Sequence, residues 1–590
     1  MELKYANEQG VLYLVALLKE HGIKRVFASP GTTNLSFVAS LQYDPFFEIY
    51  SCVDERSAAY MACGMAAETG EPVVITCTGA TASRNYMSAL TEAYYRKLPI
   101  LAVTGTQNVD RIGQLDAQII DRSQLPKDIA TLSVNIPRIH DTIDEYFCQL
   151  KINNALCQLK RRGNGPVHIN LYTSYNRDFS VAELPKVRKI ERISYDSLDS
   201  MPSMSDGRIG IFIGSHNDFT PEQTLAIEKF CKSRNAVVFC DHTSGYYGKY
   251  KVNFSIVAYQ KDATYDLCNL DLCIHIGEIS AEYACIDNLK KKEVWRVSMD
   301  GEMRDPFHAL RYVFEMTEVD FFNYYTLCDV EKDDSYWKDC KNTYDRVVSK
   351  IGDLPFSNIW IASKIAERIP RGSAIHFGIL NSIRSWNLFE LPEGVSSYAN
   401  VGGFGIDGGV SSLIGASFAN RNKLYFGVMG DLAFFYDMNC LGNRHISNNI
   451  RLLIVNNGKG TEFRNFYHTG YLFGDAADKY IAAGGHYGNK SRSLVKHFAE
   501  DLGFEYISAE SKEDFLKNAD YFVDGTMHDK PLVFEVFTKN ENESDALLSV
   551  WSIEKDPQSY VSNVKKTIAR TTRSILGERG LSIIKLILKK

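Results

Sequence analysis

Two short stretches in the last third of the chain carry residue types that suit a metal ion. Gly430-Asp431-Leu432 follows one apolar run, Asn456-Asn457 follows another, and Asn457 comes 26 residues after Asp431. Because ligands bind at the carboxyl ends of the strands in an open parallel sheet, Asp431 and Asn457 are expected to lie close together. A carboxylate and an amide oxygen suit Mg²⁺, which also keeps phosphate oxygens of a substrate in its shell. Since Gly430 lets the backbone approach a ligand, the sequence predicts a metal-bridged diphosphate site.

A second candidate lies near the start of the chain, at the head of a predicted helix. Glu55 follows Val53-Asp54 and precedes an alanine-rich segment that runs to Ala66. An acid at such a position is often only a solvated residue that the helix dipole favours. Taken alone, this segment favours the solvated acid, and a catalytic role for Glu55 is implied only together with the metal motif, by the family resemblance described below.

These residues need strands that end at turns, and the sequence supplies such strands in three sets. Short apolar runs that end at Gly or Thr are typical of buried parallel strands, and the segments between them are long enough for crossover helices. The predicted fold class is therefore α/β, with three consecutive doubly wound parallel-sheet domains. The domains are expected at 1–185, 205–345 and 356–548, with a polar linker over 178–208. The expected strands are 25–28, 72–77, 99–103, 166–171, 209–213, 236–240, 272–276, 293–297, 424–429, 452–455 and 532–536.

The composition is that of a globular chain with several domains. The 590 residues have a mass of 66.6 kDa, with 45% hydrophobic and 23% charged residues and a formal net charge of −6. This balance argues against a largely disordered chain and against nucleic acid as the main partner. The 13 cysteines form no CxxC pair, so a disulfide framework or structural zinc has little support and a reducing, cytoplasmic location is expected. We recognise no signal peptide and no run of about 18 apolar residues, so no membrane span is predicted.

The segment 555–590 differs from the rest of the sequence. From Val561 onward it has eight basic residues against one acid, and its end is apolar. A basic amphipathic helix can lie on an anionic membrane surface, so peripheral membrane contact is one interpretation. A terminal helix that packs on the protein itself or on another subunit is the interpretation we favour, although amphipathicity alone does not separate the two.

Taken together, the motifs resemble those of the thiamine diphosphate (ThDP)-dependent enzymes. Gly430-Asp431 with Asn456-Asn457 is similar to the cofactor motif of that family, and the segment around Glu55 is similar to its first-domain glutamate helix. The resemblance covers about residues 5–545 and is closest to the MenD-type (SEPHCHC synthase-like) carboligases, on 430–439 and 399–408. It implies that the three domains are a pyrimidine-binding, a central and a diphosphate-binding domain.

The resemblance also implies roles for particular residues. Asp431, Asn457 and the backbone carbonyl of Lys459 would hold Mg²⁺. Glu55 would hydrogen-bond the aminopyrimidine of ThDP and stabilise its basic imino tautomer, and Gln118 would lie near the reacting centre, so these two are the catalytic candidates. Ile406 would be the apolar wedge that bends the cofactor. The residues implied to contact the cofactor are Glu55, Asn381, Ser382, Phe404, Ile406, Gly430, Asp431, Leu432 and Asn457.

The chain departs from the MenD-type pattern where that family carries arginines for the carboxylates of isochorismate. Thr32-Thr33, Val401 and Trp386 stand at those positions, although Arg384 is close to the last of them. Loss of these bidentate cations predicts an acceptor other than isochorismate. The central domain has no GxGxxG, so a bound flavin dinucleotide is not expected. The sequence has no adjacent histidine pair, and no histidine is assigned a role.

The predicted function is ThDP- and Mg²⁺-dependent decarboxylation of a 2-oxo acid, with transfer of the acyl-anion equivalent to an unknown acceptor by a carboligase (a transferase or lyase). A simple 2-oxo acid decarboxylase or an acetolactate-synthase-like enzyme is the alternative. A regulatory or assembly protein on a retained fold is a third reading, which the joint presence of Glu55, Asp431 and Asn457 disfavours. The resemblance implies a homodimer or homotetramer, because the family's site lies between the first domain of one subunit and the third domain of another.

Overall fold

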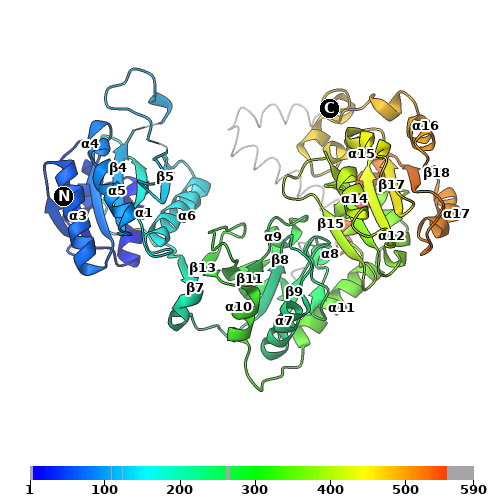
Figure 1. The fold of residues 1–590 in the computed structure, drawn as a ribbon, viewed down its shortest axis with the longest axis horizontal. Coiled ribbons are helices and arrows are strands. Elements are labelled where there is room, and N and C mark those ends of the chain that lie inside the picture. The colour runs from blue at the N-terminus through cyan, green and yellow to red at the C-terminus, as the bar shows by residue number, and fades with distance from the viewer. Residues whose placement is uncertain (1–3, 108, 123, 261–265, 555–590) are drawn as a thin grey trace. The chain divides into compact units, whose positions relative to one another are not determined.

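The computed structural model describes residues 4–107, 109–122, 124–260 and 266–554 (Figure 1). The chain forms two compact units. The first contains the residues up to Met201 together with Asp300–Glu315, and the second contains Pro202–Met299 and the residues from Met316 onward. The basic tail predicted at 555–590 lies outside the described residues.

A six-stranded parallel sheet, in the order β2-β1-β3-β4-β6-β5, forms the centre of the first unit. Helices α1 and α6 pack Leu14 and Ile152 on the face that carries Val74, while α3 and α5 cover the face that carries Ile75. Neighbouring strand residues therefore point to opposite, equally buried faces. The elements are α1 (Gln9–Glu20), β1 (Arg25–Ala28), α2 (Leu35–Gln42), β2 (Glu48–Ser51), α3 (Glu55–Thr69), β3 (Val73–Cys77), α4 (Thr81–Asn85), α5 (Met87–Tyr95), β4 (Ile100–Thr106), η1 (Val109–Arg111), β5 (Leu132–Ile136), α6 (Thr142–Gln158) and β6 (Val167–Tyr172).

The last sheet of the chain repeats this topology within the second unit. Its order, β15-β14-β16-β17-β19-β18, is that of the first sheet when the six strands of each are counted along the chain. The same doubly wound path is therefore built twice from different sequences. The elements are α12 (Asn358–Ile365), β14 (Ala374–Phe377), α13 (Asn381–Trp386), β15 (Ser396–Ala399), α14 (Gly409–Ser417), β16 (Tyr425–Gly430), α15 (Asp431–Asp437), β17 (Ile450–Asn456), α16 (Leu494–Asp501), β18 (Glu505–Ala509), α17 (Lys512–Phe522), β19 (Leu532–Phe537) and α18 (Asn540–Trp551).

Between these two sheets in the sequence lies a central parallel sheet. In the second unit its strands pair in the order β10-β9-β8-β11-β12. In the first unit, β7 (Glu191–Ser194) pairs in parallel with β13 (Leu310–Glu315). The other elements are β8 (Ile209–Ile213), α7 (Pro221–Arg234), β9 (Val237–Phe239), β10 (Lys251–Val252), α8 (Ser255–Ala258), β11 (Asn269–Ile276), α9 (Ala284–Asn288), β12 (Lys290–Val297), α10 (Glu318–Tyr325) and α11 (Ser335–Ser349).

The predicted α/β fold class with three parallel-sheet domains is confirmed, and every strand expected from the sequence is present. The prediction of a linker over 178–208 is wrong in part, because it contains β7. Most of the strands that were not predicted lie at sheet edges, namely β2, β5, β7, β10, β15 and β18. Edge strands are partly exposed and lack the continuous apolar run on which the prediction depended.

His242 joins the central sheet to the last sheet within the second unit. Its backbone N–H donates to Asn387 Oδ1 at 2.9 Å, and its Nε2 lies 3.0 Å from the carbonyls of Trp386 and Phe389. Burial lowers the pKa of His242 to about 3, so the ring is neutral and its Nε2–H donates to these carbonyls. The contact fixes the end of α13, whose first residues are predicted to bind the cofactor.

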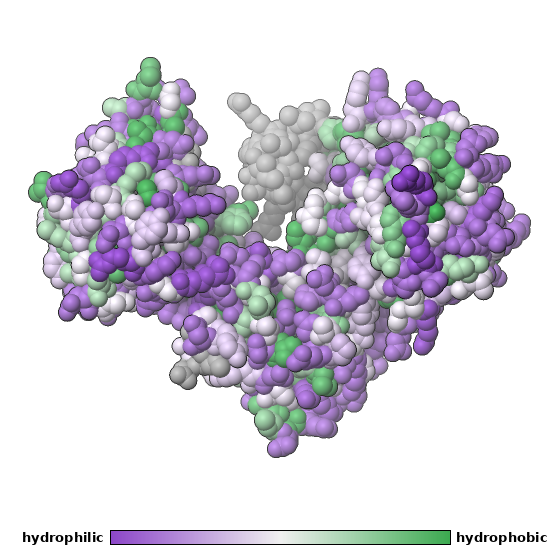
Figure 2. Space-filling view, viewed as in Figure 1, coloured by the Kyte–Doolittle hydropathy of each residue, from purple (hydrophilic) through white to green (hydrophobic). Residues whose placement is uncertain are grey.

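The surface of the protein mixes polar and apolar side chains. On the face shown in Figure 2, hydrophilic and hydrophobic residues are interspersed rather than sorted into large areas of one kind. Within the part of the chain that the structure describes, no helix has the length and apolarity needed to span a bilayer.

Candidate active site

The structure brings Asp431 and Asn457 to the same edge of the last sheet. β16 and β17 are neighbouring parallel strands, with Gly430 opposite Val455 in register. Asp431 is the first residue of α15, directly after β16, and Asn457 directly follows β17. The backbone N–H of Gly458 donates a hydrogen bond of 3.0 Å to Asp431 Oδ2. The turns after the two strands therefore meet, as expected for neighbouring strands of one parallel sheet.

Asp431 is a buried acid without a compensating positive charge. The residue is 4% exposed. Burial raises the pKa of Asp431 to about 7, although hydrogen bonds from the N–H groups of Leu432 and Gly458 act in the opposite direction. The nearby carboxyl of Glu535 raises the pKa of Asp431 further. A bound divalent cation would supply the missing positive charge and favour the ionised carboxylate.

Asn457 and Lys459 offer further oxygens at the same turn. Asn457 Oδ1 is buried and has no hydrogen-bond partner among the described residues, which is uncommon for a buried amide oxygen. The Lys459 ammonium pairs with Asp478 at 2.6 Å, so the backbone carbonyl is the group that Lys459 could offer a metal. A buried carboxylate and an unpartnered amide oxygen on two adjoining turns fit a hard cation such as Mg²⁺.

Asn381 and Ser382 form the first turn of α13, after the carboxyl end of β14. Asn381 Nδ2 donates to Glu543 Oε2 at 3.3 Å. Glu543 is buried and also accepts from the backbone N–H of Asn358 and, at 2.7 Å, from the hydroxyl of Thr538. Glu543 of α18 thus orients the amide of Asn381 by a hydrogen bond.

Phe404 and Ile406 lie in the loop between β15 and α14. Asn400 Nδ2 ties this loop together by donating to the carbonyl of Gly408 at 3.2 Å and to the hydroxyl of Ser412 at 3.0 Å. Both Phe404 and Ile406 are half-buried, and Phe404 adopts a left-handed φ of 52°. An apolar side chain held at the tip of a tied loop is a reasonable support for a ring.

Glu55 and Gln118 belong to the first unit, and the other predicted site residues belong to the second. Glu55 is the first residue of α3, whose N-cap Asp54 accepts a hydrogen bond from the N–H of Ser57 at 3.0 Å. Asn85 Nδ2 donates to Glu55 Oε2 at 3.0 Å, so the half-buried carboxyl has a fixed direction. Gln118 is exposed with a φ of 65°, and no contact between it and Glu55 is present among the described residues.

Two buried glutamates that the sequence analysis did not single out hold asparagines of this site. Glu535 accepts from Asn456 Nδ2 at 2.7 Å, and Glu543 accepts from Asn381 as described above. A sequence signal exists for both. Glu535 interrupts the apolar run of β19, and Glu543 stands on the apolar stripe of α18 with Ala546, Leu547 and Val550. Acids at such positions need hydrogen-bond donors, because burial of a bare carboxylate is costly.

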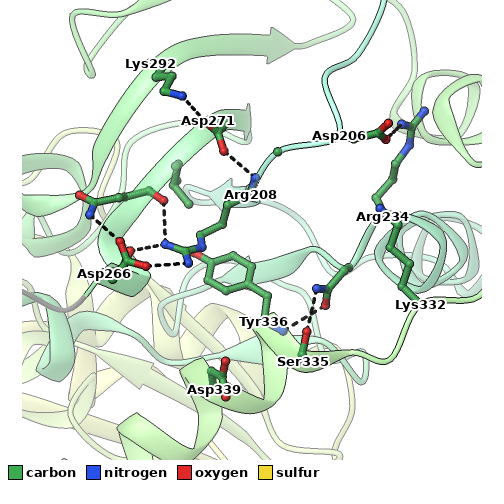
Figure 3. Close-up of a pocket in the computed structure, with 14 residues that line it drawn as sticks. Asp206, Arg208, Arg234, Asp266, Asp271, Lys292, Lys332, Ser335, Tyr336 and Asp339 are labelled. Carbon is green, nitrogen blue, oxygen red and sulfur yellow. Dashed lines mark hydrogen bonds and ion pairs between the residues drawn. The ribbon is translucent and has the colours of Figure 1, made fainter.

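A crevice of about 590 Å³ lies elsewhere, at the amino ends of strands of the central sheet (Figure 3). Most of its charged side chains neutralise one another. The ion pairs are Arg208–Asp266 at 2.9 Å, Lys292–Asp271 at 2.5 Å and Arg234–Asp206 at 3.3 Å. Because these charges are satisfied and lie at the amino rather than the carboxyl edge of the strands, we assign no chemistry to the crevice.

Similarity to known proteins extends over almost the whole chain. Residues 9–125 match the family model described as thiamine pyrophosphate enzyme, N-terminal TPP binding domain. The chain is 30% identical over 569 residues to the 2-succinyl-5-enolpyruvyl-6-hydroxy-3-cyclohexene-1-carboxylate synthase of Bacteroides fragilis, covering 92% of this chain and 98% of that relative. It is 29% identical over 572 residues to the synthase of the same name from Bacteroides thetaiotaomicron, with 92% and 98% covered. The chain belongs to the MenD-type ThDP-dependent enzymes.

Membership of the MenD-type enzymes bears on some of the predictions made from the sequence and leaves others untested. The predicted resemblance is confirmed. The metal site, the residue roles and the domain boundaries stay predictions. The geometry around Asp431 and Asn457 is compatible with the metal site. Arg384, two residues before Trp386, is held by neighbouring side chains. It donates to Glu462 Oε2 and to the hydroxyl of Tyr467, at 2.6 Å each.

The metal assignment predicts that Asp431→Ala weakens retention of ThDP in the presence of Mg²⁺, because the cation loses a charged ligand. The dissociation constant for ThDP, measured by calorimetry at fixed Mg²⁺, should rise by at least the roughly 10- to 100-fold that loss of an outer-shell partner costs. Asp529→Ala, which removes an exposed acid of the same domain, is the control. Retention equal to that of the unmodified protein would reject the metal assignment.

The hydrogen bond between Asn381 and the buried Glu543 predicts that Glu543→Gln weakens ThDP binding less than Asp431→Ala does. The variant keeps the shape of the side chain but loses acceptor capacity, so the Asn381 amide is no longer held. The dissociation constant for ThDP should rise by roughly 3- to 10-fold, the range of one hydrogen bond. Glu541→Gln on the exposed face of the same helix is the matched control. A variant with unchanged ThDP affinity would contradict the role given to Glu543.

Proposed function

We propose that this chain is a ThDP- and Mg²⁺-dependent carboligase. It would decarboxylate a 2-oxo acid and transfer the resulting acyl-anion equivalent to an acceptor. The observation that carries the proposal is a buried Asp431 carboxyl without a compensating cation beside the unpartnered Oδ1 of Asn457, at the carboxyl edge of a sheet, in a chain that belongs to a ThDP-dependent family. The relatives are named synthases, which favours bond formation over simple decarboxylation.

The first and last domains would contribute different groups to the reaction. When bound, the coenzyme supplies the carbon nucleophile and accepts the electrons left by departing CO₂. Asp431, Asn457 and the Lys459 carbonyl would hold Mg²⁺, which would supply positive charge to offset the diphosphate. Glu55 would hold a proton against the pyrimidine ring, with Asn85 fixing the direction of the carboxyl. Ile406 would support the cofactor from its tied loop.

The acceptor would differ from isochorismate. Trp386 is fully buried and donates its Nε1–H to Asn358 Oδ1 at 3.3 Å, and Val401 is 3% exposed. Thr33 is also buried, and its hydroxyl bonds Thr78 and the carbonyl of Gly105. None of these three side chains offers a charge, so the positions do not replace the missing arginine forks.

We also propose that the protein acts as a homodimer or homotetramer. In the MenD-type enzymes the site lies between the first domain of one subunit and the third domain of another, and here Glu55 and Asp431 stand on those two domains. A monomer at catalytic concentrations, seen by sedimentation with full activity, would contradict this arrangement.

Glu55→Gln tests whether turnover needs the carboxyl group of Glu55. The variant keeps the size of the side chain but holds no ionisable proton, so turnover of the 2-oxo acid should fall by roughly 100-fold or more. ThDP affinity, measured separately, should change by less than about tenfold, because the metal site is intact. Glu68→Gln, on an exposed position of the same helix, is the control. Undiminished turnover would remove Glu55 from the mechanism.

A substrate panel tests the reaction itself. The purified protein with ThDP and Mg²⁺ should release CO₂ from at least one 2-oxo acid, and added aldehydes or ketones should give carbon–carbon bonded products detectable by mass. Isochorismate should give no such product. Release of CO₂ with aldehyde as the sole product would favour a simple decarboxylase, and efficient use of isochorismate would overturn the proposal about the acceptor.

A further inference from the structure

Arg122 is a buried cation in the first unit whose donors are mostly unused. The residue is 3% exposed and lies in the segment between η1 and β5. Its Nη2 donates to the carbonyl of Gly105 at 3.1 Å. Its Nε and Nη1 are buried without a hydrogen-bond partner. A guanidinium has five N–H donors, so most of its hydrogen-bonding capacity remains for something not yet present.

The surroundings of Arg122 place it at the carboxyl edge of the first sheet. Gly105 is near the end of β4, and Gly79 follows the end of β3. A Cβ added at Gly79 would lie 3.0 Å from Arg122 Nη2, so the glycine leaves the space that the guanidinium occupies. The carboxyl ends of parallel strands are where ligands bind in open α/β sheets.

No acid of the described chain forms an ion pair with this arginine. Burial lowers the pKa of Arg122 to about 10, the Cys77 thiol acts in the opposite direction, and Arg84 lowers it further. An arginine stays charged at neutral pH even with this shift, so the protein holds a buried positive charge with no negative partner. Such a charge is costly to fold, and an anionic ligand would compensate it.

Arg122 lies at the same sheet edge as Glu55 and in the same segment as Gln118, the two catalytic candidates. The pKa of the Cys77 thiol is raised to about 12 by burial, and Glu55 raises it while Arg122 lowers it. Both charges therefore reach the same thiol at the end of β3. Gln118, predicted near the reacting centre, stands four positions before Arg122 in the same segment.

We propose that Arg122 is a binding residue for an anionic group of a substrate, most simply a carboxylate that survives the reaction. This inference rests on the proposed function. A carboxylate that leaves as CO₂ loses its charge in the transition state, so a strong cation on it would stabilise the substrate more than the transition state. A second carboxylate, on the donor or on the acceptor, keeps its charge and gains from the planar donors of arginine.

Arg122→Met tests the assignment. The ratio of kcat/KM for a dicarboxylic 2-oxo acid (2-oxoglutarate) to that for pyruvate should fall by roughly 10- to 100-fold if the donor carries the anion. If the acceptor carries it, the same fall should appear between carboxylated and neutral acceptors. Arg122→Lys, which keeps the charge but not the planar fork, should recover part of the loss. Arg111→Met, an exposed arginine of the same segment, is the control.

A second readout separates binding from folding. Removal of an unpaired buried charge should leave the Tm of the free protein unchanged or higher, and the Tm increase caused by glutarate or 2-oxoglutarate in the unmodified protein should disappear. Equal losses for charged and neutral substrates, or a lower Tm with the glutarate response retained, would overturn the inference. If the unmodified protein acts on no 2-oxo acid, the proposed function fails, while the glutarate response still tests Arg122.

Discussion

The site depends on one constraint, which is that neighbouring parallel strands end side by side. β16 and β17 each finish in a turn, and those turns bring together a buried carboxyl that lacks a compensating cation and an amide oxygen that has no hydrogen-bond partner among the described residues. Helix α15 can begin at Asp431 because Gly430 leaves the strand in an extended conformation with a φ of −73°. Glu535 and Glu543 then hold the neighbouring asparagines by hydrogen bonds. The remaining elements of the second unit support these few contacts.

The repeated topology explains why candidate site residues occur near both ends of the chain. The first and last sheets have the same strand order, so each presents a carboxyl edge with loops in equivalent places. In the first sheet that edge carries Glu55, Gly79 and Arg122; in the last sheet it carries Asn381, Asp431 and Asn457. The same doubly wound path thus presents candidate acid–base groups at the edge of the first sheet and candidate metal ligands at the edge of the last.

Sequence reasoning could predict what depends on local pattern. Buried strands such as β3 and β17 are continuous apolar runs, and the meeting of Asp431 with Asn457 followed from two such runs in one sheet. Edge strands such as β2, with its sequence EIYS, have no such run and were missed. Glu543 and Arg122 were also missed, because their burial results from packing against residues far away in the chain. A polar residue on an apolar stripe is a usable signal for Glu543, whereas nothing around Arg122 in the sequence marks it as buried.

Buried charges of opposite sign in the two sheets have a common physical meaning. Asp431 lacks a cation and Arg122 lacks an anion, and each lowers the stability of the free protein because a charge in a poorly hydrated interior is disfavoured. The same burial holds the group in place before a ligand arrives, so less reorganisation accompanies binding. A metal ion at Asp431 and a substrate anion at Arg122 would each offset the destabilisation that the uncompensated buried group causes in the free protein. The pattern of uncompensated charge is therefore consistent with the proposed ligands, a cation at the last sheet and an anionic group at the first.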